Sequence, residues 1–155
     1  MRYFINQLQL TYPHLHLISL QSLAQHTQES ILHQSSRISS ELHSHLTALN
    51  HSVTRISFIS HSLGALVLRL ALNSPLLTTY RDRFHLFLSL NSPHLGVLFP
   101  GKTTEWGSKV VSLFNNSKAV TELLFKDAKN QRNTLLYKMA LNSGKLFRYH
   151  YHHHL

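Results

Sequence analysis

The stretch RISFISHSLGALVLRLAL, residues 55–72, joins a short apolar segment to a longer one through the polar residues Ser-His-Ser. The short apolar run at residues 54–60 predicts a strand that is buried on both faces. Residues 63–73 predict a helix, which ends before Pro75 because proline disfavours helical geometry in the residue that precedes it. The chain therefore turns sharply between strand and helix, and Ser62 lies at that turn.

Patterns on either side of this stretch continue the alternation of strand and helix. Apolar runs at residues 15–20 and 84–90 predict two further strands, and an apolar stripe predicts a helix over residues 28–49. Helical patterns follow near residues 105–114, 118–125 and 128–141. The order strand, helix, strand, helix, strand predicts an α/β fold with a parallel sheet and right-handed crossovers, in a single domain over residues 1–155.

Composition limits the function classes. The chain has 155 residues, a hydrophobic content of 43% and a net charge of +9, but its cations are scattered and form no basic run. We therefore expect no specific nucleic-acid partner, while association with the surface of a membrane stays open. The N-terminus has no signal-peptide core, and the most apolar stretch is too short to span a membrane and contains Arg69. These features predict a cytoplasmic protein with no transmembrane segment.

Metal and cofactor sites are not expected. The absence of cysteine excludes disulfides and Cys-based metal sites. The C-terminal residues His150, His152, His153 and His154 offer imidazole ligands, but a short terminal tail lacks the partners that hold metal ligands in place. We interpret their metal affinity as adventitious and predict no metal and no cofactor.

The turn at Ser62 has two interpretations. A nucleophile elbow exposes a strained central residue above the sheet and needs small residues two positions before and after it, which are Ser60 and Gly64 here. The Ser62 Oγ would then attack an acyl carbon, and the backbone N–H of Leu63 would supply part of an oxyanion hole. His61 diverges from Ser62 on such a turn and is interpreted as a packing or substrate-side residue. Alternatively, Ser62 is an ordinary helix N-cap.

Two ordered motifs carry a family resemblance. The elbow stretch, followed by FHLFLSLNSPHLGVLF at residues 84–99, resembles the serine esterase family of lipase-like α/β-hydrolases, a domain of unknown function at the end of some large eukaryotic proteins. The family elbow reads close to GHSLG, so Ser60 departs from it. The resemblance implies a three-layer α/β-hydrolase core, Ser62 as nucleophile and an acyl-ester substrate, of which lipids are the expected class.

The resemblance also implies parts that this sequence does not show. The family has an HG loop before the elbow and an acid and a histidine after it, so the chain resembles a truncated copy, incomplete at both ends and inactive alone. The acids after Ser62 (Asp82, Glu105, Glu122 and Asp127) fall in loops or helices and are interpreted as solvated charges. His94 is the nearest local base by topology, but the family makes it a loop-shaping or substrate-edge residue. A non-catalytic module that binds lipid or protein, or a basic module that binds anions, remains an alternative.

Overall fold

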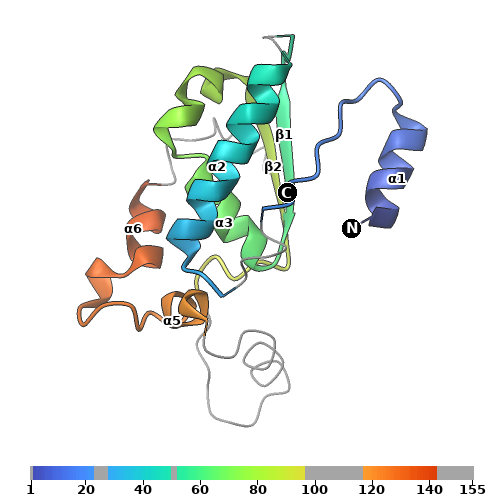
Figure 1. Ribbon diagram of the computed structural model, residues 1–155. Helices are drawn as coiled ribbons and strands as arrows, with labels where there is room; N and C mark the ends of the chain where they lie inside the picture. The colour runs from blue at the N-terminus through green and yellow to red at the C-terminus, as the bar shows by residue number, and fades with distance from the viewer. Residues whose placement is uncertain (1, 23–27, 50–51, 97–116, 143–155) are drawn as a thin grey trace, which may run out of the picture.

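The computed structural model describes residues 2–22, 28–49, 52–96 and 117–142 (Figure 1). In chain order its elements are the helices α1 (Arg2–Thr11) and α2 (Ile31–Ala48), strand β1 (Ile56–His61), helix α3 (Leu63–Ala71), the 3-10 helix η1 (Pro75–Arg83), strand β2 (Phe84–Leu90), helix α5 (Lys118–Leu123), the 3-10 helix η2 (Gln131–Asn133) and helix α6 (Leu135–Asn142). The two strands pair in parallel, as the α/β prediction requires.

The sheet has one covered face and one open face. Helix α2 packs against α3, which in turn packs against β1 (Figure 1). Side chains alternate along β1, so that Ile56, Phe58 and Ser60 are buried while the residues between them are exposed. The open face carries Ile59 and, from β2, Leu86, Leu88 and Leu90. Within the described ranges the protein thus shows one helix layer on a small sheet, which is compatible with α/β but is not a full three-layer core.

The core confirms most of the predicted elements. The stripe of α2 contributes Ile31, Ile38, Leu42 and Leu46, each of them at most 4% exposed. Strands predicted at residues 54–60 and 84–90 are β1 and β2, and the helix predicted at 63–73 is α3. The helix predicted at 128–141 is divided into η2 and α6, and the one predicted near 105–114 lies outside the described residues.

Two of the remaining segments differ from the predictions. Residues 15–20 form no strand, because this short run has no neighbouring strand to pair with among the described residues. The two residues that follow the run make polar contacts with α2 instead. The Glu41 carboxylate accepts hydrogen bonds from the backbone N–H groups of Gln21 and Ser22 at 2.8 and 3.0 Å. Helix α1 was not predicted, and Figure 1 shows it apart from the other helices.

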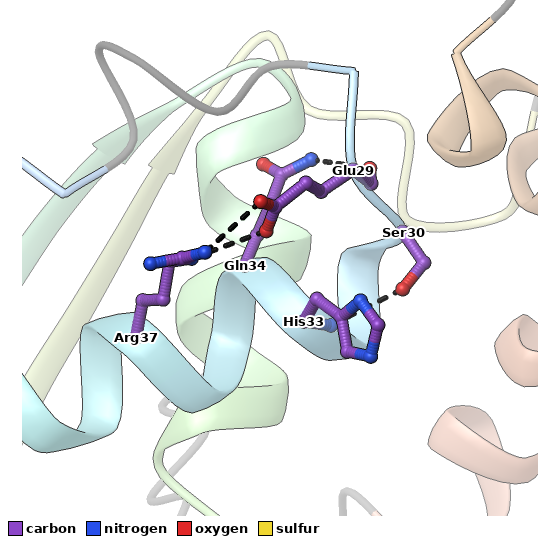
Figure 2. Close-up of polar contacts among 5 residues, drawn as sticks. All are labelled: Glu29, Ser30, His33, Gln34 and Arg37. Atoms are coloured by element: carbon purple, nitrogen blue, oxygen red, sulfur yellow. Dashed lines mark hydrogen bonds and ion pairs between the residues drawn. The ribbon is translucent and has the colours of Figure 1, made fainter.

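The N-terminus of α2 is held by polar groups from two parts of the chain. Ser30 caps the helix by accepting a hydrogen bond from the His33 N–H, and the Gln34 side chain donates to the Glu29 carbonyl at 2.7 Å (Figure 2). The Arg37 guanidinium forms a 3.0 Å ion pair with the Glu29 carboxylate. From α5, the Glu122 carboxylate accepts the backbone N–H of Ile31 at 2.7 Å. An acid interpreted from sequence as a solvated charge is therefore a half-buried helix cap.

Replacing Glu122 tests this long-range cap. Burial raises the pKa of the Glu122 carboxyl above its ordinary value, although the hydrogen bond from Ile31 opposes the rise. The folded protein therefore holds this proton more tightly than the unfolded chain, and this group's contribution to stability falls as pH rises through the interval between the two pKa values. Glu122→Ala leaves the buried Ile31 N–H without an acceptor and should lower the free energy of unfolding by about 1–2 kcal/mol.

Glu122→Gln is the matched control. Its amide oxygen still accepts the Ile31 N–H without placing a charge in a half-buried position, so denaturant unfolding should show little loss of stability at neutral pH. The Gln variant should also lose the pH dependence that Glu122 contributes. An equal loss of stability in the Ala and Gln variants would contradict the cap.

Candidate active site

Ser62 occupies a strained turn between β1 and α3. Its backbone has φ 55° and ψ −136°, a region that residues other than glycine rarely adopt. The Ser62 N–H donates to the carbonyl oxygen of Leu90 at 2.9 Å, and the Ser62 carbonyl accepts from the Ala65 N–H at 3.1 Å. The turn is thus fixed on one side by the end of β2 and on the other by the first turn of α3. The sharp turn predicted from the sequence is present.

The helix-capping interpretation of Ser62 fails. Ser30, Ser74 and Ser117 precede other helices of this chain, and each accepts a side-chain hydrogen bond from a backbone N–H of its helix. Their φ values are −63°, −58° and −78°. Ser62 has a positive φ and makes no side-chain cap hydrogen bond. Ser62 is partly exposed, and its hydroxyl is uncommitted within the described part of the chain, so it is available to attack a substrate.

The residues around Ser62 leave room for the turn. Leu63 opens α3 with its side chain in the core, and its backbone N–H belongs to the first helical turn, where N–H groups have no acceptor within the helix. Gly64 follows it in the same turn. Ser60 is 8% exposed and lies opposite Ser89 in the parallel register, on the helix-covered face. His61 is exposed at the end of β1, opposite Leu90, so strand alternation directs it away from Ser60.

The chain matches a family model over residues 1–153, and that family is described as putative serine esterase (DUF676). The chain belongs to this family. No solved structure matches it. Membership identifies the protein as esterase-like, in agreement with the resemblance of the elbow and the SPHLG loop.

His94, in the SPHLG loop of this serine esterase family member, has both ring nitrogens occupied. Its Nε2 lies 2.7 Å from the Ser89 Oγ, and its Nδ1 lies 3.4 Å from a guanidinium nitrogen of Arg69. Burial and the positive charge of Arg69 lower the pKa of His94. No hydrogen bond joins His94 to Ser62 in the described residues. The structure thus gives His94 the contacts of a loop-shaping residue, and none that would let it act as a base for Ser62.

The described carboxylates make no hydrogen bond to Ser62 or His94. Glu122 caps α2, and Asp127 accepts the backbone N–H of Leu135 at 2.7 Å at the start of α6. Asp82 is exposed in η1, while Glu105 and the histidine tail lie outside the described residues. The part of the chain that the structure describes contains no cluster of metal-ligating side chains. It also contains no helix long and apolar enough to cross a membrane.

Sequence reasoning missed Arg69. It is the single charge of the otherwise apolar helix α3, and it contacts both His94 and, at 3.4 Å, the carbonyl oxygen of Met139 in α6. A lone arginine among buried residues was a signal, because such a charge needs partners. Its partners come from segments distant in sequence, so the pattern alone could not name them.

Ser60 stands where the family elbow has glycine, and replacing it tests whether its buried hydroxyl destabilises the protein. Its Oγ is buried and has no hydrogen-bond partner among the described residues, and an unsatisfied buried hydroxyl destabilises a protein by about 1–3 kcal/mol. Ser60→Ala should therefore raise the free energy of unfolding by about 1 kcal/mol in denaturant titrations. Ser57→Ala, on the exposed side of the same strand, is the control and should be nearly neutral. A destabilised Ser60→Ala variant would show that the hydroxyl has a partner.

Gly96 supplies a second test, of the SPHLG loop. Its φ is +76°, and a Cβ atom there would lie 2.7 Å from the carbonyl oxygen of Leu123 and 2.3 Å from the ring of Phe125. Gly96→Ala should lower the free energy of unfolding by at least about 1–2 kcal/mol, because it adds left-handed strain to a contact with the backbone. Adding Phe125→Leu should recover only the part of the lost unfolding free energy that comes from the contact with the ring. A Gly96→Ala variant as stable as the wild type in thermal unfolding would refute this close approach.

Proposed function

We propose that this protein is a serine hydrolase of carboxylic esters, with Ser62 as the nucleophile. The observation that carries the proposal is the strained turn at Ser62, where φ is 55° and the hydroxyl makes no capping hydrogen bond. Backbone strain at a residue with an uncommitted nucleophilic side chain is characteristic of functional sites. Membership in the serine esterase family supports the same chemistry.

The proposed reaction has two steps. The Ser62 Oγ attacks the acyl carbon of the ester and passes its proton to solvent water, from which the leaving alcohol is later protonated, while the carbonyl oxygen gains negative charge near the N-terminus of α3. The backbone N–H of Leu63 donates to that oxygen, as one part of the oxyanion hole. The C–O bond to the alcohol then breaks, the alcohol leaves with a proton, and water hydrolyses the acyl-serine to release the acid.

The described residues supply the nucleophile but no hydrogen-bonded base or acid for it. A serine hydrolase without its base and acid retains only about 10³–10⁴-fold acceleration over water, from binding and the oxyanion hole. We therefore propose that the 155-residue chain turns over esters slowly on its own. The substrate class proposed from the family resemblance is an acyl ester, with lipids as the natural candidates.

Turnover of a short-chain chromogenic ester tests this function. The wild-type chain should show slow hydrolysis and slow covalent labelling by a fluorophosphonate, and Ser62→Ala should abolish both because it removes the attacking oxygen. Ser30→Ala, which removes a serine that does cap a helix, should keep the activity. Ser62→Gly should be inactive but more stable by about 1 kcal/mol, because glycine relieves the positive-φ strain.

Three outcomes would contradict the proposal in whole or in part. Equal hydrolysis by the wild type and Ser62→Ala would place the activity elsewhere in the chain. Robust, Ser62-dependent turnover would contradict slow catalysis and would require a base and an acid outside the described residues. Absence of both labelling and turnover would leave the alternative function, a non-catalytic module that binds lipid or protein, which is favoured by the occupied ring of His94.

A further inference from the structure

Arg69 joins three elements beside the candidate active site. It lies seven residues after Ser62 in α3, about two helical turns further along the same side of the helix. Its guanidinium reaches the Nδ1 of His94, in the loop after β2, and the carbonyl oxygen of Met139, in α6, both at 3.4 Å. The side chain is only partly buried. A single cation thus contacts the loop and a helix from a distant part of the sequence.

The contact with Arg69 fixes the hydrogen-bonding state of His94. A guanidinium can only donate hydrogen bonds, so the Nδ1 of His94 has to present its lone pair to Arg69. The proton of the neutral ring then lies on Nε2, which donates to the Ser89 Oγ at 2.7 Å. Protonation of Nδ1 would place a second donor and a second positive charge against the guanidinium.

The Ser89 and His94 contacts reach Ser62 through the end of β2. Ser89 is bonded to His94, and the next residue, Leu90, accepts the backbone N–H of Ser62 at 2.9 Å. Asn91, which follows, has a positive φ of 48°, so the chain reverses sharply there before it returns to His94. The side chains of Arg69 and His94 therefore hold the strand end on which the strained turn of Ser62 depends.

We propose that Arg69 and His94 are positioning residues for Ser62: Arg69 holds His94 as the neutral Nε2–H tautomer, and the pair fixes the strand end that orients the nucleophile. This inference rests on the proposed function of Ser62. Around the His94 ring, the described groups are the Arg69 guanidinium from α3 and the Ser89 hydroxyl and Phe87 ring from β2. Of these, Arg69 is the charged one.

The test compares the rate at which a fluorophosphonate labels Ser62 in matched arginine variants of the full chain. Arg69→Met removes the donors and the charge but keeps an unbranched apolar stem, and Arg69→Lys restores a charged donor. Loss of this hydrogen bonding should slow labelling about tenfold in Arg69→Met, with most of the rate recovered in Arg69→Lys. Arg37→Met, which removes an exposed ion pair on α2, should label at the wild-type rate.

Imidazole ¹⁵N spectra of the wild-type chain give a readout that does not require any variant to fold. His94 should show a protonated Nε2 and an unprotonated Nδ1 at neutral pH. As pH falls below the ordinary histidine pKa of about 6.5, the ring should resist protonation, and labelling of Ser62 should decline once it is protonated. A protonated Nδ1 at neutral pH would overturn the proposal.

The outcomes separate this inference from the function on which it rests. Wild-type labelling that is unchanged in Arg69→Met would overturn the positioning role and leave Ser62 as the nucleophile. An equal slowing in Arg69→Met and Arg37→Met would also overturn it, because the effect would not be specific to His94. No labelling of the wild type would overturn the proposed function and the positioning role together.

Discussion

The backbone hydrogen bond from the Ser62 N–H to the Leu90 carbonyl joins the two points at which the parallel strands end. In a parallel pair the carboxyl ends of both strands meet at one edge of the sheet, where the segments that follow them also begin. One of these segments is α3, and the other is the loop that carries His94. One strand pairing therefore sets the position of the proposed nucleophile, of the first N–H groups of α3 and of the loop.

The strain at Ser62 persists because the elements on both sides of it are well packed. A residue in a sparsely populated backbone region costs about 1–3 kcal/mol, whereas burying one large apolar side chain contributes about 1.5–3 kcal/mol. Helix α3 places Leu66 and Val67 at 0% exposure, and β1 buries Phe58. A relaxed backbone at residue 62 would swing α3 away from the sheet and expose these side chains, so packing outweighs the local cost.

The sequence predicted those elements whose patterns are local. β1, α3 and β2 combine a short apolar run with a clear boundary, and α2 has a stripe at helical spacing that is indeed buried. The run at residues 15–20 has the same local pattern, yet a strand also needs a partner, and the Glu41 carboxylate holds the adjoining residues instead.

The same difference between local patterns and long-range contacts applies to the candidate site. The turn at Ser62 followed from a strand that stops where a helix starts, so the sequence alone indicated it. The sequence could not decide between a nucleophile and a helix cap. Both interpretations use a serine at the same position and differ only in φ and in the hydrogen bond of the hydroxyl. The role of Arg69 required the contacts of residues that are 25 and 70 positions away in the sequence.

His94 shows why the orientation of a histidine matters more than its pKa for catalysis. A lowered pKa keeps the ring neutral at physiological pH, which is the state in which a general base works. A base must also direct its lone pair at the hydroxyl that it deprotonates, and in the tautomer proposed for His94 the lone pair on Nδ1 is directed at the guanidinium of Arg69. Turning the ring toward Ser62 would break its contacts with both Ser89 and Arg69. The same contacts that hold the strand end in place therefore exclude His94 as the proton acceptor, and any base for Ser62 has to come from another residue.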